Sequence, residues 1–280
     1  MKLFSNFAKQ GFFHLFQVSL LKILNKIKPL ILFILLFILG VSVSWAHHPQ
    51  IILAINHAPP YTFVDSKQQA SGLILDIMRR IESDLGFELK VVSCPFPRCL
   101  KLAKEGKVDM LGGLIKTEER NKYLDFIEPA YMELNSSFVF YALKDKGLIV
   151  NEYKQLMGKR IAVKRKAAHF KRFDKDTSLN KVIVSSEKVA MDMLLKGRVD
   201  IVIAIEETAD HALKFLNQAS HKLQKLNYRH TDNILGYAAF SRKYHNLFIL
   251  NRIKQKMRYF QKNGVLTALV KPYNLPPIDE

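Results

Sequence analysis

Cysteine is almost missing from this chain of 280 residues, which contains only Cys94 and Cys99. Four residues separate them, whereas a redox-active pair has the spacing Cys-x-x-Cys. A structural zinc site would need further Cys or His ligands with their own spacing, and no such pattern is present. The sequence therefore predicts neither a redox motif nor a metal site.

The sequence also lacks the common catalytic motifs. It contains no nucleophile elbow, no phosphate-binding loop and no His-Glu-x-x-His zinc motif. His57 and His169 stand alone, and a lone histidine is weak support for catalysis. We therefore predict that the protein is not an enzyme and needs no cofactor, with an enzyme as the least favoured alternative.

Acidic residues are absent from the first 46 residues, which contain five lysines. Residues 30–43 are mostly apolar and lead into Ser44, Trp45 and Ala46, a layout typical of a secretory signal peptide. The apolar stretch is shorter than the roughly 20 residues of a membrane-spanning helix. We predict that residues 1–46 are a cleavable signal peptide and that the mature protein is periplasmic. An uncleaved membrane anchor is the alternative.

Export affects how the cysteines and the charge are interpreted. In an oxidising compartment, an even cysteine count favours a structural disulfide between Cys94 and Cys99, with free thiols as the alternative. Loss of the five leader lysines lowers the formal net charge from +18 to +13. The basic residues are scattered, which is typical of a solvated surface, although an anionic membrane or ligand would also suit them. We expect no nucleic-acid partner, because no recognised binding motif accompanies the charge.

Strand-like apolar runs alternate with helical patterns along the mature chain, which predicts an α/β fold with largely parallel sheets. Strands are expected at 51–55, 87–92, 108–111, 137–143, 160–163, 182–184, 201–205 and 234–240. Helices are expected from Gly72 to a stop at Gly86, over 98–105, after an N-cap at Thr117, near Ala168, Ser186 and Thr208, and over 247–262.

Several short motifs occur in a characteristic order. They are Ala58-Pro59-Pro60-Tyr61, Ser71-Gly72-Leu73-Ile74-Leu75-Asp76, 107–113, Thr117-Glu118-Glu119-Arg120, 125–131, 197–200 and Asn263-Gly264. Together they resemble the family 3 group of type 2 periplasmic solute-binding proteins, which includes polar amino-acid receptors of ABC transporters. The resemblance implies a two-lobed fold with two hinge strands. Lobe 1 would comprise residues 47–138 plus 239–280 and lobe 2 residues 139–238, with a ligand cleft between them.

Independently of the resemblance, ligands of open α/β sheets bind outside the carboxyl ends of strands, where Tyr61, Gly113 and the helix start at Thr117 would lie. Arg120 would bind a carboxylate through its planar fork, and Tyr61 would form an aromatic wall. A surface arginine paired with an acid and a tyrosine packed in the core are the alternatives. The predicted ligand-binding residues are Tyr61, Gly113, Thr117, Arg120, Lys166 and Glu206.

Three positions depart from the family pattern. Ile115 stands where the receptors place Ser or Thr, and Ile205 stands where an acid binds the α-amino group. The turn at 164–168 is basic where a Gly-Thr-Thr-like turn is usual. A zwitterionic amino acid would suit this site only if Glu206 or Glu207 replaced the missing acid, and Glu206 could do so only with a shifted register or an earlier strand end. A dicarboxylate or an anionic sugar derivative suits the basic turn better.

The sequence as a whole predicts a monomeric periplasmic solute-binding protein that closes on a small polar or anionic solute, amino-acid-like or carboxylate. Its partner would be an ABC transporter permease for uptake or a membrane sensor for signalling. The alternatives are a membrane-tethered sensor or interaction module and, less favoured, a periplasmic enzyme on the same fold.

Overall fold

The computed structural model describes residues 28–29, 48–134, 136–214 and 221–278. Apart from Lys28 and Pro29, the predicted signal peptide lies outside the described residues. Within the described ranges, no helix combines the length and apolar character that a membrane crossing requires. Residues from His48 to Glu280 form one compact unit, and the architecture described below is that of this unit.

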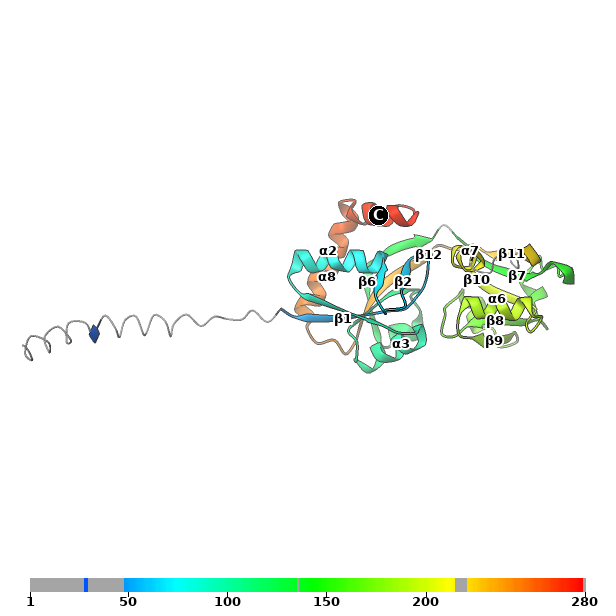
Figure 1. The fold of residues 1–280 in the computed structure, drawn as a ribbon, viewed down its shortest axis with the longest axis horizontal. Coiled ribbons are helices and arrows are strands. Elements are labelled where there is room, and N and C mark those ends of the chain that lie inside the picture. Colours follow the sequence, from blue (N-terminus) through cyan, green and yellow to red (C-terminus); the bar gives the residue numbers. More distant parts are fainter. Residues whose placement is uncertain (1–27, 30–47, 135, 215–220, 279–280) are drawn as a thin grey trace, which may run out of the picture. The chain divides into compact units, whose positions relative to one another are not determined.

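A first sheet of five strands has the order β4-β1-β5-β12-β6. The strands are β1 (Gln50–Ile55), β4 (Glu88–Ser93), β5 (Met110–Leu114), β6 (Leu124–Leu134) and β12 (Ile234–Ser241). Core contacts place α2 (Leu73–Leu85), α8 (Leu247–Lys262) and α9 (Val265–Val270) on one face and α3 (Phe96–Glu105) on the other (Figure 1). This sheet is therefore covered on both sides, as in other α/β folds.

A second sheet of five strands has the order β11-β7-β10-β8-β9. The strands are β7 (Phe138–Leu143), β8 (Arg160–Lys164), β9 (Asn180–Val184), β10 (Ile201–Ile205) and β11 (Leu223–His230). Helices α6 (Glu187–Leu195) and α7 (Glu206–Lys214) cover one face, whereas Phe170 and Phe173 near α5 (Lys171–Lys175) pack on the other. A small hairpin, β2 (Thr62–Val64) and β3 (Ala70–Gly72), and the short helix α4 (Glu118–Asn121) complete the elements near the site.

The predicted α/β architecture is confirmed, but the sheets are mixed rather than largely parallel. In the first sheet β1 is parallel to β4 and β5, whereas β12 is antiparallel to β5 and β6. In the second sheet β8 is parallel to β9 and β10, whereas β7 is antiparallel to β10 and β11. The antiparallel pairs arise because the chain leaves the first sheet from β6 into β7 and returns from β11 into β12. Such exit and return strands run in opposite directions without a crossover helix.

Most predicted elements lie where the pattern put them. Helix α2 ends at Gly86, which adopts the left-handed conformation with φ of 70°, and α8 spans the predicted residues 247–262. Cys94 and Cys99 form the predicted disulfide. The strands expected at 137–143 and 234–240 correspond to β7 and β12, while their role as hinges and the limits of the two lobes stay predictions.

Four boundaries differ from the prediction. Strand β5 continues past its two glycines to Leu114, because Leu114 pairs again with Tyr237 of β12 beyond a register shift at the glycines. Helix α3 begins earlier, at Phe96, with proline in its first turn, where no N–H donor is needed. Helix α5 begins at Lys171 rather than near Ala168, and α7 begins at Glu206 rather than near Thr208, directly after β10.

Candidate functional site

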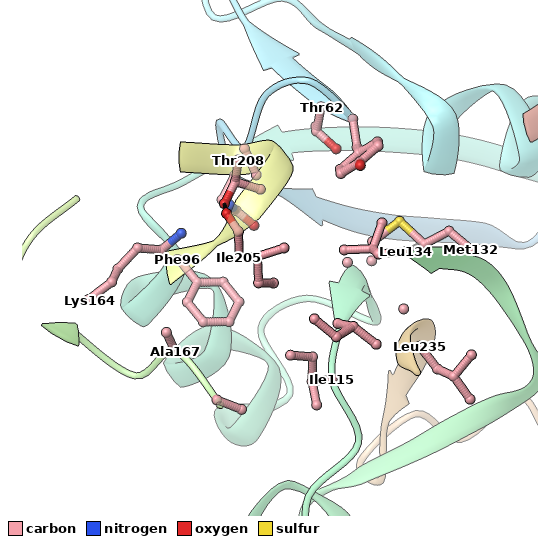
Figure 2. Close-up of a pocket in the computed structure, with 18 of the residues that line it drawn as sticks. Thr62, Phe96, Ile115, Met132, Leu134, Lys164, Ala167, Ile205, Thr208 and Leu235 are labelled. Carbon is pink, nitrogen blue, oxygen red and sulfur yellow. Dashed lines mark hydrogen bonds between the residues drawn. The ribbon is translucent and has the colours of Figure 1, made fainter. Parts of the chain in front are cut away.

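A cavity of about 130 Å³ lies between the carboxyl ends of β1 and β5 in the first sheet and the ends of β8 and β10 in the second. Most of its lining is apolar. Figure 2 shows part of this lining, including Phe96, Ile115, Met132, Leu134, Ile205 and Leu235. Both sheets therefore contribute side chains to one site, at the position expected for ligands in open α/β sheets.

Arg120 differs from the other charged residues that line the cavity, because only 5% of its surface is exposed. Its Nη1 donates to the Ile115 carbonyl at 2.6 Å and its Nη2 to the Lys166 carbonyl at 2.9 Å. The guanidinium carbon lies 5.4 Å from the centre of the Phe96 ring, within cation–π range. Burial lowers the pKa of Arg120 below its ordinary value.

No described carboxylate forms an ion pair with this guanidinium. An arginine offers more N–H donors than the two carbonyls accept, and a buried charge without a counter-ion is costly. The arrangement therefore suits an anion that enters the cavity and completes the hydrogen bonding of Arg120. A carboxylate can accept such bonds in a bidentate manner.

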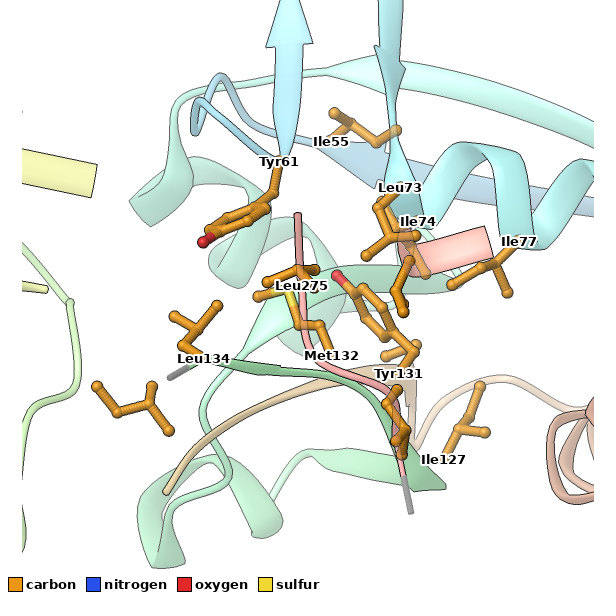
Figure 3. Close-up of a cluster of buried hydrophobic side chains, with 14 of the residues drawn as sticks. Ile55, Tyr61, Leu73, Ile74, Ile77, Ile127, Tyr131, Met132, Leu134 and Leu275 are labelled. Carbon is orange, nitrogen blue, oxygen red and sulfur yellow. The ribbon is translucent and has the colours of Figure 1, made fainter. Parts of the chain in front are cut away.

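Tyr61 lines the same cavity as Arg120, and 8% of its surface is exposed. Its carbonyl accepts a hydrogen bond from Leu73 N at 3.0 Å, which connects it to the start of α2. Figure 3 shows its ring near Met132 and Leu134 in the core cluster. Burial, together with the charge of Glu207, raises the pKa of Tyr61, so the phenol stays protonated and available as a donor.

Gly113 lines the same cavity at the carboxyl end of β5. Its φ is 68°, a left-handed conformation that favours glycine, and its N–H donates to Tyr131 Oη at 2.6 Å. Tyr61, Gly113 and Arg120 are thus three predicted site residues that the fold brings together around one cavity.

The other three predicted residues are not among those that line the cavity. The Thr117 hydroxyl accepts from Arg120 N at 3.2 Å and caps α4, so it positions Arg120. Lys166 contributes its carbonyl to Arg120, while its exposed Nζ lies 3.6 Å from Glu119. Glu206 begins α7 and lies 2.7 Å from Lys225 Nζ. A direct ligand contact by Thr117, Lys166 or Glu206 stays a prediction.

Lys164 belongs to the predicted basic turn, whereas its partner Glu187 and the lining residue Phe96 were not anticipated. Lys164 Nζ lies 3.1 Å from Glu187 Oε1, and both side chains line the cavity. Phe96 follows the carboxyl end of β4 and lies within the small disulfide loop. This position at a strand end could have identified it as a site residue from the sequence. Lys164 and Glu187 are 23 residues apart, so no local pattern connects them.

Across the described part of the chain, no group of three or more His, Cys, Asp or Glu side chains could hold a metal ion.

A family model described as bacterial extracellular solute-binding proteins, family 3, matches residues 51–276. The search of curated proteins found no significant match.

Solved structures share the fold at low sequence identity. A histidine kinase sensor domain with similarity to periplasmic binding proteins is 17% identical, with a TM-score of 0.70, over 83% of this chain and 99% of that one. A mutant of ArgBP from T. maritima is 24% identical, with a TM-score of 0.64, over 80% and 94% of the two chains. An ancestral arginine-binding protein bound to arginine is 21% identical, with a TM-score of 0.65, over 81% and 98%. These likenesses show the two-lobed fold.

Proposed function

Because this chain belongs to the bacterial extracellular solute-binding proteins of family 3, we propose that it is a periplasmic receptor for a small organic anion. The observation that carries the proposal is the guanidinium of Arg120, which is buried at the cavity and, among the described residues, hydrogen-bonds only to backbone carbonyls. A ligand carboxylate would supply the counter-ion that this charge lacks.

The proposed mechanism is closure of two lobes on the ligand. Arg120, Tyr61 and Gly113 belong to the part built on the first sheet, whereas Lys164 and Ile205 come from the second sheet. A ligand that contacts both parts stabilises the closed arrangement relative to an open one. Arg120 already donates a hydrogen bond to the Lys166 carbonyl of the second part. The same side chain would therefore both bind the ligand and hold the two parts together.

The receptor's partner is proposed to be an ABC transporter permease or a membrane sensor. Both roles occur among proteins of this fold, since the similar structures include a histidine kinase sensor domain and a substrate-binding protein of an amino-acid ABC transporter. The receptor is proposed to act as a monomer without catalytic activity. The predicted signal peptide would place it in the periplasm.

Replacement of Arg120 by Ala tests the proposal. In a thermal-shift screen of the mature protein against amino acids, monocarboxylates, dicarboxylates and sugar acids, a ligand at a hundredfold excess over its Kd should stabilise the wild type by about 2.7 kcal/mol. We expect Arg120→Ala to lose this stabilisation and Arg120→Lys, which keeps the charge but not the fork, to retain only part of it.

Arg252→Ala is the matched control, because Arg252 lies on α8 over the ring of Phe248 at 5.6 Å and does not line the cavity. It should respond to the ligand as the wild type does. Full ligand stabilisation of a folded Arg120→Ala variant, checked by circular dichroism, would remove Arg120 from the site.

A further inference from the structure

The charged side chains that line the cavity leave one positive charge in excess. Lys164 and Glu187 are paired at 3.1 Å, with 22% and 28% of their side chains exposed, and their charges offset one another. Lys166, which the basic turn offered as a further cation, pairs instead with Glu119 outside the cavity. Among the described residues, Arg120 is therefore the cavity cation without an ion-pair partner, although the charges of Asp174 and Glu119 act on it from further away, and one such cation matches one carboxylate better than two.

An ammonium group would find no free carboxylate among the described lining residues. Ile205, at the position expected for an acid, faces the cavity, and the Thr208 hydroxyl donates to the Ile205 carbonyl at 2.9 Å. Glu206 is occupied by Lys225 at 2.7 Å and by Arg229 at 3.6 Å. A buried ammonium without a partner carries a large desolvation penalty.

Glu207 does not fill this gap. Its side chain lines a separate hollow with Pro60 and Leu275, on another side of Tyr61. One of its carboxylate oxygens is buried there without a hydrogen-bond partner. Glu207 therefore follows the cavity residue Ile205 closely in the sequence, but its side chain faces a different hollow.

The size and lining of the cavity indicate what the rest of the ligand is. Its volume is about 130 Å³, and its walls include Phe96, Ile115 and Ile205. An apolar protein cavity of about 150 Å³ holds benzene, so a branched alkyl chain or a single ring fits within this space. We infer that the ligand is a monocarboxylate with a compact apolar body and no ammonium group. This inference rests on the proposed function and specifies the ligand class of the same site.

Two matched pairs of compounds test the inference by calorimetry on the mature wild-type protein. The pairs are 4-methylpentanoate against L-leucine and 3-phenylpropanoate against L-phenylalanine, which differ only in the α-ammonium group. We expect at least one deaminated acid to bind about tenfold or more tightly than its amino acid. Equal or tighter binding of both amino acids overturns the inference.

A gain-of-function variant gives a second measurement. Ile205→Asp should bring the Kd of the amino acid closer to, or below, that of its deaminated partner, because the new carboxylate can pair with the ammonium. Ile183→Asp is the control, since Ile183 is 62% exposed on β9 and away from the cavity, and it should keep the wild-type preference. An unchanged preference in folded Ile205→Asp counts against the inference.

Failure of the inference is distinguishable from failure of the proposed function. If wild-type protein binds amino acids or succinate through Arg120 but neither deaminated acid, the receptor function stands and the ligand class is wrong. If no carboxylate of any kind binds, both are overturned.

Discussion

Gly72 and Gly86 flank helix α2 and have very different surroundings. A Cβ added at Gly72, whose φ is 132°, would lie 2.3 Å from the carbonyl oxygen of Tyr61. A Cβ at Gly86, whose φ is 70°, would meet nothing within 4 Å. We therefore expect Gly72→Ala to lower the free energy of unfolding by about 2–5 kcal/mol, but Gly86→Ala by only about 1–2 kcal/mol. Urea unfolding of the two variants measures the difference.

Gly72→Ala should also weaken ligand binding, because the backbone that it displaces carries Tyr61 at the cavity. Gly86→Ala provides the control for a general loss of helix stability. Similar losses of stability in the two variants would show that the contact with Tyr61 does not restrict residue 72.

At the scale of single residues, Arg120 could be predicted because Thr117, three positions earlier, caps its helix and both belong to one short motif. The pairing of Lys164 with Glu187 could not, because it depends on how β8 and α6 come together. Glu206 was predicted from its nearness to Ile205. The direction of its side chain is decided by Lys225 on the neighbouring β11, which no local pattern reveals.

At the scale of elements, α3 is connected to the strand before it by the disulfide between Cys94 and Cys99. Cys99, Leu100 and Ala103 of this helix pack in the core cluster that covers one face of the first sheet. Because the bridge closes a short loop, we expect Cys94→Ala/Cys99→Ala to lower the free energy of unfolding by about 2 kcal/mol, near the low end for disulfides.

Urea unfolding with and without reductant checks this expectation. Reductant should lower the stability of the wild type toward that of the double variant and should leave the variant unchanged. Ligand affinity should also fall in the variant, because Phe96 lies inside the bridged loop and lines the cavity. A double variant as stable as the oxidised wild type would mean that the bridge does not constrain the unfolded chain.

Helices α2 and α8 were predictable because their apolar positions recur with the helical period and each ends in a local stop signal. Strand directions were not, since the same apolar run suits a parallel or an antiparallel neighbour. The run through Gly112 and Gly113 shows the same limit. The two glycines do interrupt the regular pairing, since Gly113 has a φ of 68°, but Leu114 pairs again with Tyr237 of β12 and the strand ends only there.

At the scale of the whole receptor, three ion pairs join α4 beside the first sheet to the part built on the second sheet. Glu118 lies 3.6 Å from both Lys171 and Lys175, and Glu119 lies 3.6 Å from Lys166. All of these side chains are exposed, so each pair is screened by water and salt. They flank the bond from Arg120 to Lys166, and therefore any opening of the cavity on this side would separate them.

The charges of Lys175 and Lys171 lower the pKa of Glu118 below its ordinary value of 4.5. A carboxyl whose pKa is lowered in the folded form stabilises that form at pH values above the unfolded pKa, and the effect is lost as the pH falls through the lowered pKa. If closure separates and rejoins these pairs, ligand affinity should fall modestly, by less than about fivefold, between pH 6 and about pH 3.5 or on addition of about 0.5 M NaCl at neutral pH. Calorimetric titrations of the wild type across these conditions would measure the loss.

Glu118→Gln isolates the contribution of the ion pairs from other effects of acid and salt. The amide keeps the shape of the side chain but cannot pair with Lys171 or Lys175, so the variant should bind more weakly at neutral pH and show a flatter dependence on salt. Glu105→Gln is a suitable control, because Glu105 pairs with Lys107 in the same part of the molecule as α3, and its loss should leave ligand affinity unchanged. An identical salt dependence in wild type and Glu118→Gln would mean that these pairs persist in every state of the receptor and that closure takes place elsewhere.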